Sequence, residues 1–336
     1  MKKRDYDVAD LDQISDYATI SQVAHMYYDL GILQPRIAEK LYFSRSKVSR
    51  MLSKARELGI VDIKVKRFVN RLPNIENVLF EKFPQTRCIV LTSFDDARGE
   101  ESTIDAITNF AAMYVSDRVK GECVIGITGG GTISRVAGKL QKIHPCRAQV
   151  VQLIGASTNT YVAGDLRYQI NHVSKVYEAE GHFLNTPLYI DDLYAKEILL
   201  RDPTIESVFS LMKKCDLVLT GIGIFDVSGD MPDWYGYIND AHREELRRLG
   251  AVGSLCAQYF DREGRLLDCE WNRKCIAMPW RDMKSARETI AIAAGERKAA
   301  PILAALRGQL ADIIITDANT AARVIELNRQ IDGKER

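Results

Sequence analysis

The stretch Glu122–Ile143, ECVIGITGGGTISRVAGKLQKI, carries three local signals in sequence. It opens with an apolar run at 124–127, which has the length and composition of a buried strand. A turn of three glycines and a hydroxyl follows at 128–132. Apolar residues then recur every three or four positions, as on one face of a helix, at Ile133, Val136, Ala137, Leu140 and Ile143. The stretch therefore predicts a strand, a glycine turn and a helix N-terminus.

A glycine turn at the start of a helix is suited to hold an anion. Glycine lets the backbone approach a ligand closely, and the free N–H groups and the helix dipole favour negative charge. The alternative is a tight turn with nothing bound. No Lys follows Gly131, so the turn is not a Walker loop, and it is not GxGxxG. We expect a phosphate or carboxylate of a small ligand here, with no nucleotide class implied.

Length and composition predict a soluble protein of about two domains. The chain has 336 residues, of which 46% are hydrophobic, and no apolar run approaches the roughly 18 residues that a membrane span needs. The first residues lack the apolar core of a secretory signal. Its seven cysteines are scattered without a C-x-x-C pair, which favours reduced core residues in a cytoplasmic protein over disulfides or a zinc site.

The net charge of +1 hides a basic segment. Residues 34–71 contain 11 Lys and Arg against 3 Asp and Glu, whereas the chain beyond residue 71 is mildly acidic. Such a distribution indicates a polyanionic partner for the first part of the chain only.

The first seventy residues have the pattern of a helix-turn-helix domain. We expect a mobile tail over 1–14 and a domain over 15–70, with helices from Ser15 to Gly31, Gln34 to Leu41 and Arg45 to about Leu58. Ser44 is a suitable N-cap for the third helix. Residues 60–67 then alternate apolar with polar, which predicts a half-buried strand that serves as a wing.

Cations and short hydroxyls cluster on the outward face of the third helix. The predicted DNA-contacting residues there are Arg45, Ser46, Lys47, Ser49 and Arg50, and on the wing they are Lys64 and Lys66. The first turns of a recognition helix reach base edges, while Ser and Lys side chains hold phosphates. The alternative, a solvated charged face on a helical bundle, explains the order of cap, cations and stop less well.

A linker helix is expected over 71–84, bridging to a large domain over 85–330. Its apolar residues could pack on a second subunit or on the chain's own body. Strands and helices alternate beyond it, which predicts a mostly parallel, Rossmann-like α/β sheet with helices on both faces. The expected strands are 88–91, 124–127, 149–154, 183–184, 216–220, 275–278, 289–293 and 313–316.

Ligands in such sheets bind beyond the C-terminal strand ends. The loops expected there are 128–132, 220–223, 250–254 and 294–298. Lys298 would lie in the first turn of a helix over 300–306, where a cation is electrostatically disfavoured. An anionic ligand would explain its position. A solvated surface lysine is the alternative.

The segment VAHMYYDLGILQPRIAEKLYFSRSKVSRMLSKARELGIVDIKV (residues 23–65) resembles the N-terminal domain of the SorC family of bacterial, sugar-responsive transcriptional regulators. Later segments are also similar to that family: GGGTISRVA (129–137), the GAVG…FD..G pattern (250–264), AGERKAAPILAALRG (294–308) and TDANTAARVI (316–325). The resemblance covers nearly the whole chain in order. One departure is Leu33, where members usually place a Thr cap.

The resemblance implies an effector domain related in fold to sugar-phosphate isomerases, and an oligomer, either a homodimer or a homotetramer. Its effector would be a phosphorylated sugar or polyol that changes affinity for double-stranded operator DNA. By resemblance, Gly130, Gly131 and Thr132 would hold the phosphate and Lys298 would neutralise it. Gly221 and Gly223 would permit close approach of the sugar. Ser254 stands where members often have Asp, so a sugar identity borrowed from a relative does not transfer.

Two other classes of function are weighed against a regulator. A sugar-phosphate isomerase or deaminase would need an acid and a base. The candidates are His172, His182, Asp165, Asp226 and Asp230, and none forms a persuasive pair, so we expect no catalytic residue, cofactor or metal site. An RNA-binding or protein-binding module would use the same basic face, but the aromatic stacking surface of RNA binders is lacking.

Overall fold

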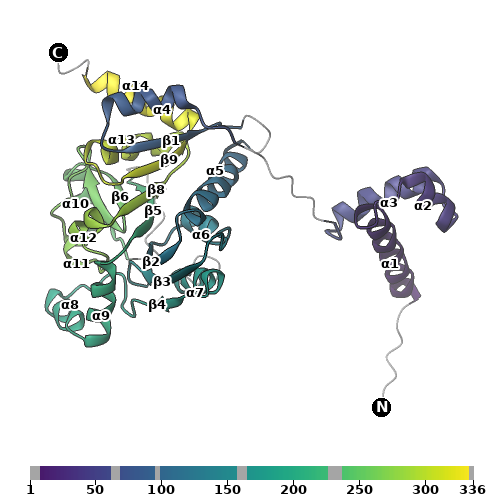
Figure 1. Ribbon diagram of the computed structural model, residues 1–336, viewed down its shortest axis with the longest axis horizontal. Helices are drawn as coiled ribbons and strands as arrows, with labels where there is room; N and C mark the ends of the chain where they lie inside the picture. Colours follow the sequence, from purple (N-terminus) through teal and green to yellow (C-terminus); the bar gives the residue numbers. More distant parts are fainter. Residues whose placement is uncertain (1–7, 62–68, 95–98, 157–164, 226–236, 333–336) are drawn as a thin grey trace. The chain divides into compact units, whose positions relative to one another are not determined.

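The computed structural model has two compact units, 1–67 and 68–336 (Figure 1). The residues that it describes are 8–61, 69–94, 99–156, 165–225 and 237–332. No helix in these ranges combines the length and apolar character needed to cross a membrane.

The first unit contains three helices around a small apolar core. They are α1 (Val8–Tyr28), α2 (Gln34–Leu41) and α3 (Arg45–Glu57). The second and third lie where the sequence predicts them. The first begins at Val8 rather than Ser15, so residues 8–14 are helical and not part of a tail. Val23, Ile37 and Val48 are fully buried where the three helices meet.

Local caps fix the ends of α2 and α3. The Ser44 side chain accepts a hydrogen bond from the Lys47 N–H at 3.2 Å, which confirms the predicted N-cap. Leu33 precedes α2 without a capping side chain, and Pro35 occupies its first turn. Ile60 and Val61 pack against the base of α1 and α3. The wing predicted to follow, with Lys64 and Lys66, lies outside the described residues.

The second unit alternates strands and helices as expected. Its elements are α4 (Pro73–Lys82), β1 (Arg87–Leu91), α5 (Gly99–Ser116), β2 (Gly121–Ile127), α6 (Gly131–Ala137), β3 (Cys146–Gln152), α7 (Leu166–Tyr177), β4 (Glu180–His182), α8 (Leu193–Leu200), α9 (Pro203–Met212), β5 (Leu217–Ile224), α10 (Asp240–Arg248), β6 (Ala251–Leu255), β7 (Gln258–Asp261), α11 (Glu270–Lys274), α12 (Trp280–Ser285), β8 (Glu288–Ile292), the 3₁₀ turn η2 (Glu296–Lys298), α13 (Ala299–Arg307), β9 (Ile313–Asp317) and α14 (Ala318–Asp332).

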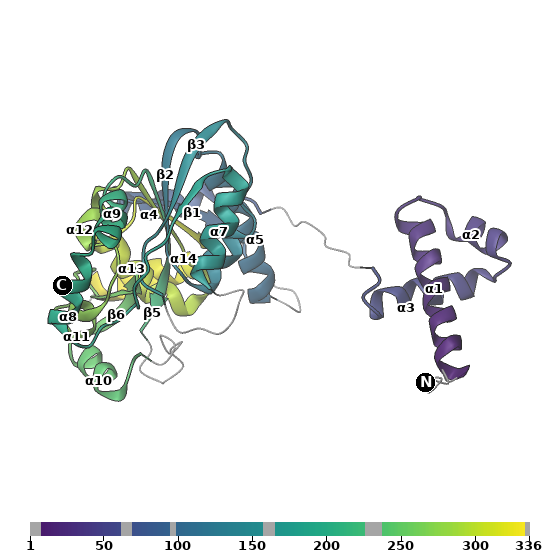
Figure 2. The ribbon, with the colours of Figure 1, turned by 90° about the horizontal axis from the view of Figure 1, so that it is seen from below.

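The main sheet has the strand order β1-β9-β8-β5-β2-β3-β4, and all of these neighbours are parallel. Helices cover both faces. Figure 2 shows α5 and α7 on one side of the sheet, with α9, α12 and α13 on the other. Strands β8 and β9 are almost wholly buried and β5 is buried over 217–220, as expected for parallel strands that helices cover on both faces. The predicted fold class is therefore confirmed.

The bridging helix α4 belongs to the second unit. Leu79 on its inner face is 2% exposed and joins the main core, while Phe80 faces outward. Glu76 is also buried and accepts the backbone N–H of Val90 in β1 at 3.0 Å. Of the two partners considered for this helix, the structure thus provides the chain's own sheet.

Several strand boundaries differ from the prediction. The loop expected at 250–254 is strand β6, which pairs antiparallel with the end of β5 and with β7. Strand β5 consequently continues to Ile224, so Gly221 and Gly223 lie within a strand and not in the loop after it. The strand expected at 183–184 is the short β4 just before it. Residues 275–278 contribute only isolated bridges at Cys275 and Ala277.

The direction of strand addition reverses between β2 and β5. From β2 the chain adds β3 and β4 toward one edge, and from β5 it adds β8 and β9 toward the other. Such a switch point leaves a crevice beyond the C-terminal ends of the two strands. Gly126 of β2 leaves room for the side chains packed on it. A Cβ added there would lie 2.8 Å from Leu153 Cδ1 and 2.9 Å from Cys215 Sγ.

We predict that Gly126→Ala lowers the free energy of unfolding of the second unit by about 1–3 kcal/mol, since overpacking strains a filled core. Gly131→Ala is the matched control, because a Cβ there meets nothing within 4 Å. Urea unfolding followed by tryptophan fluorescence measures both, as every tryptophan lies in the second unit. Equal destabilisation by the two substitutions would contradict the packing account.

Candidate functional site

The glycine turn lies at the switch point, directly after β2. Its first residue is anchored, because the Thr128 N–H donates to Leu219 O of β5 at 3.0 Å. Gly130 has a φ of 119°, which L side chains rarely adopt, and its carbonyl accepts the Ser134 N–H as the N-cap of α6. Gly130 and Gly131 are exposed and Thr132 is half-buried. The predicted phosphate-binding turn thus faces solvent at the crevice.

The N–H groups at the start of α6 have no backbone acceptor among the described residues. Gly131, Thr132 and Ile133 precede the first N–H that a helical carbonyl satisfies, that of Ser134. Unpaired N–H groups at a helix N-terminus attract an anion. A side chain at Gly131 would meet no neighbour within 4 Å, so the surroundings leave room for a ligand group.

The second predicted segment lies beside this turn. A Cβ at Gly221 would be 3.8 Å from Ile133 of α6, so β5 passes close to the glycine turn. Gly223 pairs with Ser254 of β6, and the Ser254 Oγ lies 2.2 Å from the position that a Gly223 Cβ would take. Ser254 is only 4% exposed. Its hydroxyl therefore fills the space that the missing side chain of Gly223 leaves.

Lys298 joins the same group of residues from the other neighbour of β5. It ends η2, precedes α13 and is half-buried, so it is not a solvated surface lysine. Its Nζ donates to the carbonyl of Ile222 at 2.5 Å. Burial, and to a lesser degree the nearby Arg297, lowers the pKa of Lys298 to about 8. A half-buried ammonium that an anion could pair with is thus bonded to Ile222, the residue between Gly221 and Gly223.

The structure adds a buried carboxylate that the sequence interpretation missed. Asp317 ends β9, is 3% exposed and accepts the Gly295 N–H at 2.9 Å, which holds the loop that leads to Lys298. It also caps α14 by accepting the Thr320 N–H at 2.9 Å. The signal that could have found it is an Asp between an apolar strand and a helix with Thr three residues on, which is an N-cap pattern.

The five predicted DNA-contacting residues on α3 are all exposed. The buried side chains of α3, Val48, Leu52 and Ala55, lie on its opposite face. Lys47 Nζ lies 4.2 Å from the centre of the Phe43 ring, and Ser46 Oγ lies 3.0 Å from Ser44 Oγ. Within the described residues no carboxylate pairs with Arg45 or Arg50. Both guanidinium groups are therefore available to a polyanion.

Of the five residues weighed for an enzyme, the structure describes three, and these three are engaged in local structure. Asp165 caps α7 by accepting the Arg167 N–H at 2.8 Å. His172 stacks on Tyr168 of the same helix, and His182 lies in β4. Asp226 and Asp230 lie outside the described residues. Among the described residues, no group of three or more His, Cys, Asp or Glu could hold a metal ion.

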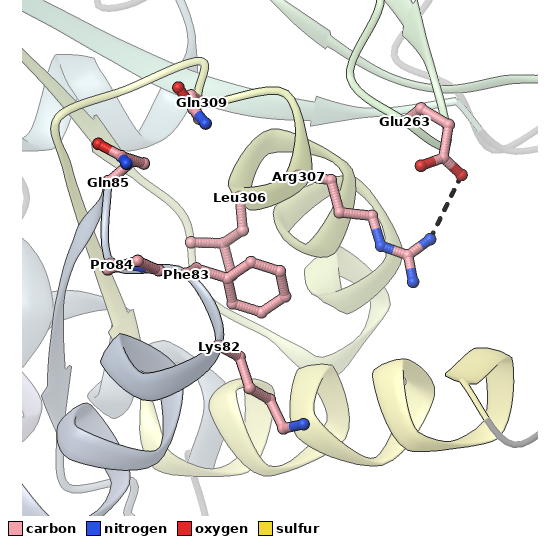
Figure 3. Close-up of a pocket in the computed structure, with 8 residues that line it drawn as sticks. All are labelled: Lys82, Phe83, Pro84, Gln85, Glu263, Leu306, Arg307 and Gln309. Carbon is pink, nitrogen blue, oxygen red and sulfur yellow. Dashed lines mark hydrogen bonds and ion pairs between the residues drawn. The ribbon is translucent and has the colours of Figure 1, made fainter.

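A pocket of about 430 Å³ lies elsewhere (Figure 3). It is lined by Lys82, Phe83, Pro84, Gln85, Glu263, Leu306, Arg307 and Gln309. Residues 83–85 precede β1 and Gln309 precedes β9, so the pocket is at the N-terminal edge of the sheet. Arg307 is held by Glu263 at 3.4 Å and Asn328 at 3.0 Å. None of the predicted effector residues lines it.

Comparison with known proteins agrees with this arrangement. Residues 68–326 match the family model Sugar-bind, a sugar-binding domain. The sorbitol operon regulator of Klebsiella pneumoniae is 26% identical over 322 residues, which cover 94% of this chain and all of the relative. The deoxyribonucleoside regulator of Bacillus subtilis is 26% identical over 304 residues, 90% of this chain and 96% of the relative.

Solved structures show the same fold. The crystal structure of the full-length regulator SorC from Klebsiella pneumoniae matches 92% of this chain and 99% of its own, with a TM-score of 0.68 at 23% identity. A transcriptional regulator from Streptococcus pneumoniae matches 76% of this chain and 97% of its own, with a TM-score of 0.71 at 23% identity. The sugar-binding family model covers nearly all of the second unit. The relatives named here are transcriptional regulators, and this chain matches nearly their whole length. The chain therefore belongs to the sugar-binding domain family of SorC-type transcriptional regulators.

Proposed function

We propose that this protein regulates transcription of a carbohydrate or polyol catabolic operon by binding operator DNA through α3, under the control of a phosphorylated sugar or polyol bound in the second unit. The observation that carries the proposal is the crevice at β2 and β5. There, exposed glycine N–H groups and the half-buried Lys298 come from different strands to one edge of the sheet. Neither feature stabilises the fold in an obvious way, whereas both suit a small phosphate ester.

The control follows from linkage between two binding events. An effector that favours one conformation of the chain shifts its affinity for operator DNA, and the operator shifts effector affinity by the same factor. Two recognition helices related by symmetry would read a pseudo-palindromic operator, so the regulator acts as an oligomer. The sugar-regulator relatives support this class of function.

The helix α8 offers a surface for self-association. None of its residues is buried, and Leu193, Tyr194 and Ile198 are 45%, 73% and 52% exposed. Tyr194 and Ile198 are four residues apart and so lie on one face. Asp192 caps the N-terminus and the exposed Arg201 follows the C-terminus. Two antiparallel copies of α8 would therefore bring opposite charges together at both ends.

DNA binding should be strongly salt-dependent and should require α3. We predict that Arg45→Ala and Arg50→Ala each weaken binding by about 1–3 kcal/mol if the arginine reads a base, or lower the salt slope by about one if it holds a phosphate. The measurement is a salt titration by fluorescence anisotropy on duplexes selected from a random pool. Arg262→Ala, an exposed cation of the second unit, serves as the control. A flat salt response would reject the DNA-binding function.

Phosphorylated sugars should stabilise the protein, and their unphosphorylated parents should not. A ligand that binds the folded chain raises its melting temperature. We predict that Gly131→Val abolishes the shift by closing the approach to the N–H groups, while Gly138→Val, at the other end of α6, retains it. Lys298→Ala should weaken binding about tenfold or more, since charge-assisted hydrogen bonds contribute about 1.5–3 kcal/mol.

The pH dependence gives a further check on the same binding measurement. Lys298 has a pKa of about 8 in the free protein, so the ammonium is present below that pH and is lost above it. A phosphate ester is fully ionised only above its second pKa of about 6. Affinity should therefore be highest between these values and fall as pH rises past about 8. Lys298→Ala should lose the fall at high pH. If Gly131→Val and Lys298→Ala both bind as the parent does, the effector site lies elsewhere.

Self-association should depend on α8. We predict that Tyr194→Glu and Ile198→Glu each shift sedimentation toward smaller species, because a buried unpaired carboxylate is costly at an interface. Met113→Glu, which alters an equally exposed apolar residue on α5, should leave the distribution unchanged. An oligomer that persists in both α8 variants would place the interface on another surface.

A further inference from the structure

The Asp317 carboxylate accepts four hydrogen bonds, each from a neutral group. Oδ2 accepts the Gly295 N–H at 2.9 Å and the Thr320 hydroxyl at 2.5 Å. Oδ1 accepts the Thr320 N–H at 2.9 Å and the Ser93 hydroxyl at 3.1 Å. Asp317 is 3% exposed and Thr320 is fully buried, so the two Thr320 donors would lack water as a partner without this carboxylate. Three segments that are far apart in sequence thus depend on one side chain.

The first of these segments is the loop that presents Lys298. Gly295 begins it with a φ of 97°, and the Lys298 N–H donates to Gly295 O at 2.8 Å. The Lys298 ammonium now donates to Ile222 O. An anion in the crevice would compete with that carbonyl for the ammonium. Any adjustment of Lys298 is then passed to Gly295 and to its bond with Asp317.

The second segment is the end of β1, which is hydrogen-bonded to residues that follow the first unit in sequence. Ser93 follows β1, and its Oγ also accepts the Asn319 N–H at 3.2 Å. Residues 70–72 run antiparallel to the end of β1. The Thr92 N–H donates to Asn70 O at 3.0 Å, and the Leu72 N–H donates to Val90 O at 2.8 Å. This strap (residues 70–72) is among the first described residues after the boundary between the two units.

The strap is also held by a partly buried ion pair to α4. Arg71 donates to Glu76 through Nε at 3.0 Å and through Nη2 at 2.5 Å. Glu76 also accepts the Val90 N–H. Glu76 of α4 therefore bonds both the strap and β1. Because of these common bonds, we expect a shift at the end of β1 to displace residues 70–72 as well.

We propose that Asp317 is a positioning residue that couples the Lys298 loop to the strap at residues 70–72, through Ser93 and the end of β1, and so transmits effector binding toward the DNA-binding unit. This inference rests on the function proposed above. It adds the set of residues through which effector binding would reach the first unit, which the effector contacts alone do not specify. Coupling of this kind requires an element that both sites bias, and here the element is the shared carboxylate.

The test is hydrogen exchange of the full chain, read over peptides that cover the strap, the glycine turn and the loop 294–298. The probes are inorganic phosphate, the one group that every proposed effector shares, and fructose 6-phosphate as a representative ester. In the parent protein each probe should slow exchange at the glycine turn and the loop, and also at the strap. Protection at these sites reports local opening on an equilibrium scale.

Asp317→Asn and Ser93→Ala should separate the two responses. An amide has one accepting oxygen, so Asp317→Asn leaves two of the four donors unpaired. Ser93→Ala removes the bond from β1 to Asp317 together with the acceptor of the Asn319 N–H, and it leaves the other three donors to Asp317 in place. It is the milder variant should the first fail to fold. We predict that ligand-induced protection remains at the glycine turn in both variants and is lost at the strap. Without ligand, strap exchange should rise about fivefold, the effect of losing roughly one net hydrogen bond.

Asp312→Asn is the matched control, because Asp312 lies next to the other end of the same strand and accepts the Thr289 N–H at 2.7 Å. It should keep the strap response. A response that survives in both Asp317→Asn and Ser93→Ala, or disappears equally in Asp312→Asn, overturns the inference. So does a parent protein whose glycine turn responds while its strap does not, although the proposed function then stands. If no probe protects the glycine turn of the parent, the proposed effector site and the inference both fail.

Discussion

The reversal of strand order between β2 and β5 is the constraint on which the proposed effector site depends. Parallel strands end at the same edge of a sheet, and a crevice forms beyond the ends of the two neighbouring strands where the strand order reverses. Gly126 lets β2 and its neighbours pack at this point without a side chain between Leu153 and Cys215. The glycine turn and Gly221 are thereby brought together although about ninety residues separate them. The crevice is a consequence of topology, and its chemistry comes from the loops around it.

That chemistry is unusual because the edge buries groups that prefer water. Lys298 satisfies its ammonium with a single backbone carbonyl in the described structure, and burial lowers its pKa. Asp317 satisfies its carboxylate with four neutral donors. Polar groups that are buried without full pairing cost stability, so their positions call for a functional reason. An anionic effector would be a better hydrogen-bond partner for the Lys298 ammonium than Ile222 O. The resulting movement of the Lys298 loop would then alter the hydrogen bonds of Asp317.

Local sequence signals predicted much of this structure. The order of Ser44, cations and buried Val48 identified α3, and the apolar run before Thr128 identified β2, because both patterns rest on neighbours within a few residues. The sequence could not place β6. Its Gly-Ala-Val-Gly segment has loop chemistry, and only pairing with the extended end of β5 makes it a strand. Likewise Asp317 was missed. Its local pattern could have indicated a helix cap, but its bonds to Ser93 and Gly295 join residues that no local pattern connects.

The energetics of control set a condition that the proposed mechanism meets at one point. A ligand shifts a conformational equilibrium only by the difference between its affinities for the two states. Contacts with the glycine turn alone would be nearly equal in both states, because Thr128 and Ser134 fix that turn to β5 and α6. The Lys298 loop differs, since its ammonium must exchange Ile222 O for the ligand. In the proposed mechanism, the difference in effector affinity between the two states is therefore concentrated at Lys298, and Asp317, which is bonded to the Lys298 loop, transmits it.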